Sequence, residues 1–272
     1  MRSARQGTAI ALVVVATLIS GCGNDTTADP SDTTSSTSST TSSTTSSSST
    51  TSTSTTSTTT TTLDPAPTTP VPEADLPGEA FELTPPEGRV LAVVGVAFDD
   101  VLNLRRMPGT DQDIVGMLSP TLDGIVATGR ARMLTQTIWW EVTDPAGIVG
   151  WVNARYTAQI GPTGDETARV VDQVGSIPSA ATMEELGALV ADEMRGDPEA
   201  PFTITQTTPA TVGDLGEVTF DLIGLGDDSV HGLRLHVFGT PDETVGFGLK
   251  SVESTDLCDS LRGVSEGSGF CA

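Results

Sequence analysis

A long run of serine and threonine separates the N-terminal segment of this chain from the part whose composition suits a folded domain. Residues 31–62 hold 31 serines or threonines in 32 positions. Such a segment has no apolar side chain to bury, so nothing offsets the conformational entropy that ordering would remove. Five prolines follow between residues 65 and 77, and proline favours stiff, extended backbone. The sequence therefore predicts a disordered Ser/Thr/Pro-rich tether over residues 22–80.

The first 22 residues have the order of an export signal. Arg2 and Arg5 precede an apolar stretch at residues 9–19, and small residues then lead to Cys22. The stretch is about 11 residues long, whereas a membrane-spanning helix needs about 20. The run ending at Cys22 resembles the lipobox of bacterial lipoproteins. The resemblance implies removal of the signal peptide, residues 1–21, a diacylglyceryl group on Cys22 and an extracytoplasmic, membrane-anchored location. A secretory signal without lipid is the alternative.

Charge and cysteine content narrow the partners and the compartment. The formal net charge is −23 at pH 7, so neither nucleic acid nor anionic lipid headgroups are expected as partners. With Cys22 lipidated, Cys258 and Cys271 remain as an even pair in an oxidising compartment. This predicts a disulfide that fastens the C-terminal tail. A metal site is not expected at this pair, because no histidine lies nearby.

Residues 88–161 alternate short apolar runs with turn residues, which predicts strands. The runs lie at residues 90–96, 101–104, 125–128, 137–143 and 148–152. That many strands in about 70 residues indicates a small barrel.

Several motifs in this region resemble bacterial SH3 (SH3b) domains. Leu102–Arg105 leads into Pro108–Thr110, as the family's L-N-V-R segment leads into a Gly-rich turn. Val115–Leu118, Trp140–Val142 and Gly150–Tyr156 match the strands that follow. The resemblance implies an SH3-like β-barrel and a role in binding cell-wall peptide.

Residues 168–272 match no family pattern, and their own pattern predicts a small α+β domain. Thr182 and Glu185 form a capping box, and apolar residues then recur on one helical face as far as Met194. Four strand-like runs follow, at residues 202–207, 217–223, 232–238 and 245–252. The predicted fold class is therefore mainly β: a small SH3-like β-barrel, then a domain boundary near residues 161–164, then a small α+β domain over residues 168–272.

No catalytic residue, metal or cofactor is expected. Gly263–Gly267 spells the G-x-S-x-G nucleophile pattern, but no strand or helix pattern flanks it and no histidine follows it. His231 and His236 lie five apart in one strand-like run, so they should project to opposite faces. The acidic clusters lack the spacing of a calcium loop.

The aromatic residues of the predicted barrel are the candidate ligand contacts. Strand alternation puts Trp140 in the core and turns Trp139 outward. Trp151 and Tyr156 lie near the closing edge, and Arg105 offers donors for a carboxylate. We expect Trp139, Trp151, Tyr156 and Arg105 to line a groove that grips peptide or glycan. The alternative is that the aromatic side chains fill the small core.

These features predict a non-catalytic, lipid-anchored protein whose barrel binds peptidoglycan, with a tether that lets the folded part reach into the wall. Two other interpretations stay open. In one, the barrel is a spacer and the C-terminal domain binds another envelope protein. In the other, the chain is a wall-active hydrolase that uses carboxylates alone. The tether is either an O-glycosylated stalk, as its Ser/Thr density indicates, or an unmodified spacer.

Overall fold

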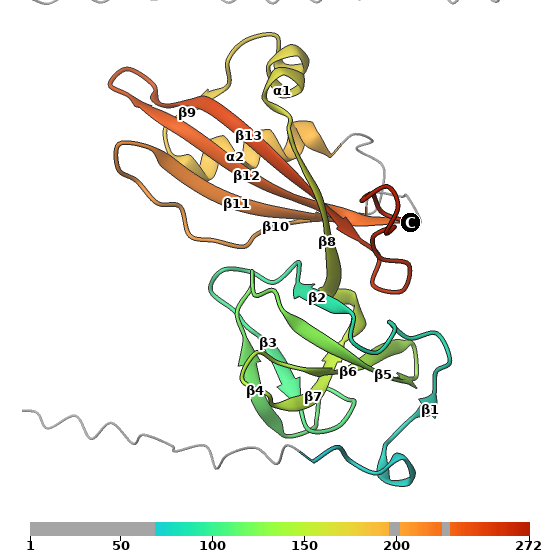
Figure 1. Cartoon of the computed structure of the whole chain (residues 1–272). Coiled ribbons are helices and arrows are strands. Elements are labelled where there is room, and N and C mark those ends of the chain that lie inside the picture. Colours follow the sequence, from blue (N-terminus) through green and yellow to red (C-terminus); the bar gives the residue numbers. More distant parts are fainter. Residues whose placement is uncertain (1–68, 196–201, 225–228) are drawn as a thin grey trace, which may run out of the picture. The chain divides into compact units, whose positions relative to one another are not determined.

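The computed structural model describes residues 69–195, 202–224 and 229–272. The signal peptide, Cys22 and most of the predicted tether lie outside the described residues. The described part is mainly β, as predicted, and its strands form antiparallel pairs that follow one continuous order. Two α-helices accompany the strands in this part, α1 (Thr167–Val174) and α2 (Met183–Met194), and Figure 1 shows their positions.

The strands of the N-terminal lobe, residues 71–160, surround one apolar core. They are β2 (Val90–Val93), β3 (Leu102–Arg105), β4 (Ile114–Leu118), β5 (Ile125–Leu134), β6 (Thr137–Thr143) and β7 (Val149–Asn153). Their order in the sheet is β2-β5-β6-β7-β3-β4, and Leu91, Leu104 and Trp140 are among the core residues. The sheet is not closed, because β4 pairs only with β3 among the described strands. The strands predicted from alternation are present, whereas the closure of the predicted barrel is not.

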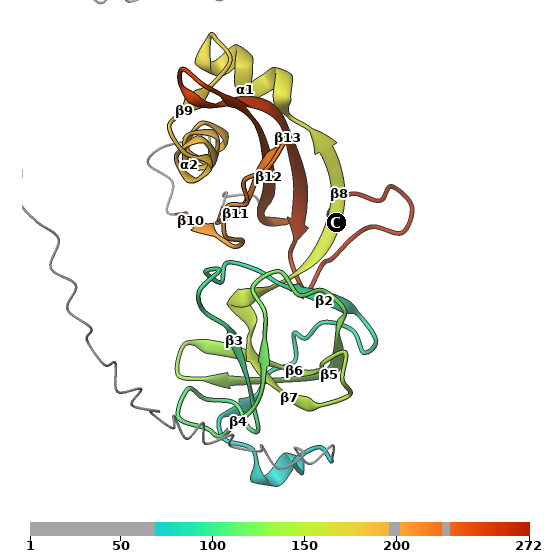
Figure 2. The same cartoon turned by 90° about the vertical axis from the view of Figure 1, so that its left-hand side faces the viewer.

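The C-terminal lobe, residues 161–272, is a sheet with helix on one face. Its strands are β9 (Ser179–Ala180), β10 (Thr203–Gln206), β11 (Gly216–Ile223), β12 (Val230–Asp242) and β13 (Gly246–Cys258). Helix α2 lies along one face of this sheet (Figures 1 and 2). Gly187 allows the close approach, because a Cβ there would lie 2.5 Å from the Phe220 ring. The helix begins where predicted, with the Thr182 side chain accepting a hydrogen bond from the Glu185 backbone N–H.

One strand, β8 (Thr157–Asp165), belongs to both lobes. Its first two residues pair with β2, and most of the rest pairs with β13. Residues 161–164, where the sequence predicted the boundary between two domains, continue this strand. Gly161 serves a close approach instead, because a Cβ there would lie 2.8 Å from Cys258 Sγ. An irregularity in the β8–β13 register accommodates Pro162, which has no N–H to donate.

Side-chain contacts beside β8 also join the two lobes. The Asp221 carboxylate is fully buried and accepts hydrogen bonds from the Arg234 guanidinium and from the Gly95 N–H. Arg234 also donates to the Val93 carbonyl, at 2.8 Å. A small apolar cluster lies nearby, made of Val94, Ala158 and Leu257. The packing of each lobe therefore depends on residues of the other.

The end of the predicted tether packs against the N-terminal lobe. Residues 71–80 contain a short 3-10 turn, η1 (Glu73–Asp75), and the strand β1 (Glu79–Ala80), which pairs with β5. Leu76 is buried in a cluster with the rings of two tryptophans. The sequence assigned residues 71–80 to the disordered tether, whereas in the structure they pack against the N-terminal lobe. Leu76 gives this segment an apolar side chain to bury, whereas the Ser/Thr run of residues 31–62 has none. Composition alone grouped the two segments and therefore missed the packing of residues 71–80.

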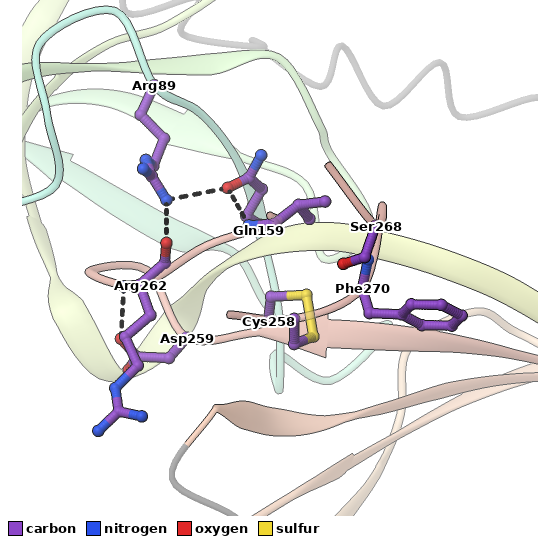
Figure 3. Close-up of a disulfide and its surroundings, with 9 residues drawn as sticks. Arg89, Gln159, Cys258, Asp259, Arg262, Ser268 and Phe270 are labelled. Carbon is purple, nitrogen blue, oxygen red and sulfur yellow. Dashed lines mark hydrogen bonds between the residues drawn. A yellow bond between two sulfur atoms is a disulfide. The ribbon is translucent and has the colours of Figure 1, made fainter. Parts of the chain in front are cut away.

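Cys258 and Cys271 form the predicted disulfide (Figure 3). The bond holds the C-terminal tail against the N-terminal lobe. Arg89, which precedes β2, donates to the Arg262 carbonyl at 2.9 Å, and Leu261 packs against the apolar core of the N-terminal lobe. The tail thus covers part of a lobe that lies far from it in sequence.

Candidate ligand-binding pocket

Three of the four predicted contact residues, Arg105, Trp139 and Tyr156, line one pocket of about 410 Å³. Its walls come from the loop between β2 and β3, from β3 and β6, from the end of β7 with the turn after it, and from β10. The other lining residues include Val96, Asp100, Val101, Asn103, Thr110, Asn153 and Thr205. Both lobes therefore contribute, because Thr205 belongs to the C-terminal lobe.

Arg105 is held at the end of β3 by a single described hydrogen bond. Its Nη1 donates to the Gln112 carbonyl at 2.6 Å. The other N–H groups of this guanidinium have no protein partner in the described part of the chain, and the side chain is half-buried. A planar donor group held in this way suits a carboxylate ligand.

Tyr156 is positioned by a short 3-10 turn, η2 (Ala154–Tyr156). The Asn153 side chain caps this turn by accepting from the Arg155 N–H at 3.1 Å. The Thr157 hydroxyl donates to the Ala154 carbonyl, and the Arg155 guanidinium lies 5.2 Å from the centre of the Tyr156 ring. These contacts fix the ring of the half-buried Tyr156 at the pocket wall.

Trp139 does not have the exposed indole that alternation predicted. Only 4% of its surface is accessible. Alternation itself is correct, because Trp139 and Trp140 belong to apolar clusters on opposite faces of β6. The outward face is covered, however, by residues 71–80, whose Leu76 packs against Trp139. Trp139 can therefore offer a ligand only the part of its ring that borders the pocket.

Trp151 does not line this pocket, and its predicted role as a ligand contact is not supported by the geometry. Its side chain is 1% exposed and lies in the cluster with Trp139 and Leu76. The Arg130 guanidinium lies 5.6 Å from the centre of its ring. The same covering segment explains the burial of Trp151.

The residues that sequence reasoning missed are the polar ones of the pocket. Asn103 shares the outward face of β3 with Arg105, since Leu102 and Leu104 are buried and the residues after them are not. The period-two pattern of this strand contained that signal. No such signal pointed to Thr205, because its place depends on pairing across more than a hundred residues. Phe98 illustrates this, since its N–H donates to the Gln206 carbonyl of β10.

The pocket offers a ligand both aromatic surface and hydrogen-bonding groups. It combines aromatic surface with two amides, hydroxyl groups, one arginine and the exposed Asp100. In the described residues, no three His, Cys, Asp or Glu side chains gather closely enough to hold a metal ion. Such a mixture suits a peptide or glycan that carries a free carboxylate.

Ser265, His231 and His236, which the sequence analysis considered for catalysis or metal binding, lie outside this pocket. Ser265 of the G-x-S-x-G sequence lies in the loop closed by the disulfide, where its N–H donates to the Phe270 carbonyl. The His236 ring contacts Glu217 on the sheet face opposite α2, and His231 contacts the Arg155 carbonyl. No helix of the described residues is long and apolar enough to cross a membrane.

Comparison of the chain with protein-family models, with curated proteins and with solved structures finds no match. The function is therefore argued from the pocket and from the sequence features around it.

Proposed function

We propose that the chain is a non-catalytic cell-envelope lipoprotein whose N-terminal lobe binds a peptide of cell-wall peptidoglycan. In this proposal residues 88–161 are an SH3b-like domain with an open sheet, and the C-terminal lobe is the small α+β domain that it carries. Cys22 bears the lipid, and the Ser/Thr-rich tether spans the distance from the membrane to the wall. Two acyl chains on Cys22 would give stable anchoring, whereas one chain is marginal.

The pocket of Arg105, Trp139 and Tyr156 carries the proposal. The motifs that resemble SH3b domains lie on β3, β4, β6 and β7, and β3, β6 and β7 supply five of the thirteen residues that line the pocket. Wall peptides carry free carboxylates, and Arg105 has donors available for one. Asn103 and Asn153 add amides that can hydrogen-bond peptide backbone.

The test is co-sedimentation of the unlipidated chain, from residue 23 onward, with purified peptidoglycan. We expect saturable binding that weakens about ten-fold or more in Arg105→Ala, because a charge-assisted hydrogen bond to a desolvated ligand is lost. Arg169→Ala is the matched control, since Arg169 is an exposed arginine on α1, outside the pocket. Its binding should equal that of the unaltered chain.

Folding of both variants is checked by thermal unfolding before binding is compared. Absence of saturable binding by the unaltered chain would refute the proposal, as would equal binding by the two arginine variants. Either result would turn the search for function to a protein partner of the C-terminal lobe.

A further inference from the structure

The segment Val71–Ala80, called the strap from here on, packs against the surface of the N-terminal lobe. It lies over the outward sides of β5, β6 and β7, where two arginines and two tryptophans face it. The strap hydrogen-bonds both arginines and shares an apolar cluster with both tryptophans. Its sequence is acidic and proline-flanked, with Glu73, Asp75 and Glu79 among its ten residues.

The side chain of Arg132, on β5, donates hydrogen bonds only to the strap among the described residues. Its guanidinium donates to the carbonyls of Glu73 and Gly78 and pairs with the Glu73 carboxylate at 2.7 Å. Its Nε has no partner among the described residues, and only 8% of the side chain is exposed. A buried cation without a partner is strongly unfavourable, so this arginine requires an acidic occupant above it.

Arg130 links the strap to a carboxylate inside the lobe. It pairs with Glu73 of the strap at 2.9 Å and with the buried Glu141 at 2.6 Å, and it donates to the Val71 carbonyl. Burial lowers the pKa of the Arg130 guanidinium, but the hydrogen bonds and charges of Glu73 and Glu141 outweigh it and raise the pKa overall. Glu73 thus bridges two arginines, which is how an acidic peptide is commonly recognised.

The apolar and backbone contacts of the strap complete a peptide-binding pattern. Leu76, three residues after Glu73, is buried in one apolar cluster with Trp139 and Trp151. Glu79 and Ala80 then pair with Met133 and Arg132, adding a short strand to β5. Strand β2 pairs with the first two residues of β5, Ile125 and Val126. The part of β5 that pairs with the strap is therefore not paired with β2. Strand addition of this kind gives affinity through the backbone and specificity through alternate side chains.

We infer that the surface formed by Arg130, Arg132, Trp139 and Trp151 is a binding site for an acidic linear segment of a partner protein, occupied in this structure by the chain's own strap. The ligand needs a carboxylate to bridge the two arginines, an aliphatic residue three positions later, and an extended stretch that pairs with β5. The strap keeps the site filled until such a segment displaces it.

Displacement is feasible because the strap is attached at few points. The Glu73 side chain is 59% exposed, so its ion pairs are partly screened by solvent. Leu76 is its one fully buried apolar side chain, and its strand is two residues long. Segments with so few buried contacts open at lower cost than the sheet beneath them.

The experiment measures binding of a fluorescent peptide, residues 69–80, to the chain from residue 23 onward. In the chain, Glu73→Gln with Leu76→Ser loosens the strap. We expect this variant to bind the wild-type peptide about ten-fold or more tightly than the unaltered chain does, because a competing segment in cis is weakened. The matched control is Glu82→Gln with Leu83→Ser, which changes the same residue types at exposed positions just after the strap. It should bind the peptide as weakly as the unaltered chain does.

Peptides carrying Glu73→Gln or Leu76→Ser should lose binding to the loosened chain. If that chain is folded and does not bind the wild-type peptide, the inference is wrong. Dimerisation of the unaltered chain through its straps, inhibited by the peptide, would make the occupant a second copy and would overturn the assignment to a partner. No wall material is used, so the result is independent of the proposed wall binding.

Hydrogen exchange on the unaltered chain gives a second test that needs no variant. The amides of Leu76 and Phe81 donate to the Glu73 and Ala131 carbonyls. They should exchange about 100-fold faster than amides at the centre of β6, because the strap opens without the lobe. Equal protection of the strap and β6 would show that the segment is a fixed part of the fold, and the inference would fail.

Discussion

Among the residues that the structure describes, two carboxylates are buried, and each is paired with one arginine. Glu141 meets Arg130, and Asp221 meets Arg234. Glu141 lies two residues after Trp139 on β6, on the face that alternation predicted to be exposed, and it is buried in the structure. Because removing one partner of a buried ion pair leaves the other charge uncompensated, these residues should be the most sensitive positions outside the apolar cores.

Asp221→Asn tests this at the junction of the lobes. The Asp221 carboxylate accepts from Arg234 and from the Gly95 N–H, so its loss leaves a guanidinium uncompensated. We expect the free energy of unfolding to fall by about 3 kcal/mol, measured by urea denaturation. Asp192→Asn is the matched control, because that carboxylate makes an exposed pair with Arg195 on α2; its change should stay below about 0.5 kcal/mol. A small effect of Asp221→Asn would mean that water reaches the junction.

At the scale of elements, the local signals predicted most strands and missed the short helix. The Thr182 cap and the apolar face of α2 act within one turn of the chain, so the sequence contains them. Helix α1 has no side-chain cap and only one buried residue, Val170. It is held by packing against the sheet, and its own sequence therefore carried little evidence for it.

Another element, the C-terminal tail, is held by the disulfide. Replacing Cys258 and Cys271 together by alanine removes a bond that spans 13 residues. We expect the free energy of unfolding to fall by about 3 kcal/mol, and the Ala272 amide, which donates to the Gly263 carbonyl, to lose its protection from exchange. Reductant should destabilise the unaltered chain and leave the double variant unchanged. An equal response of both to reductant would contradict this account.

At the scale of the whole described body, the lobes share a strand and a buried ion pair. Strand β8 pairs with β2 and with β13, and the tail of the C-terminal lobe packs on the N-terminal lobe through Leu261. The division into two domains near residue 161 was inferred from glycine and proline, which usually mark turns. Here these residues permit strands to approach closely.

This sharing predicts one unfolding transition for both lobes. The three tryptophans all lie in β6 and β7, so fluorescence reports the N-terminal lobe. Both described α-helices lie in the C-terminal lobe, so circular dichroism at the helical band reports mainly that lobe. We expect the two urea transitions to coincide, and Asp221→Asn to shift them together. Two separate midpoints would show that the lobes unfold independently.

The sequence by itself determined what depends on neighbouring residues: the strands that alternate, the capped helix, the disulfide pair of a cysteine-poor chain and the candidate set that includes Arg105, Trp139 and Tyr156. Only the tertiary structure decided what depends on distant residues. It buried Trp139 and Trp151 under a segment that composition assigned to the tether, and it brought Thr205 to the pocket. The reason is that exposure is a property of what covers a side chain, and Leu76 lies more than sixty positions away from the rings that it covers.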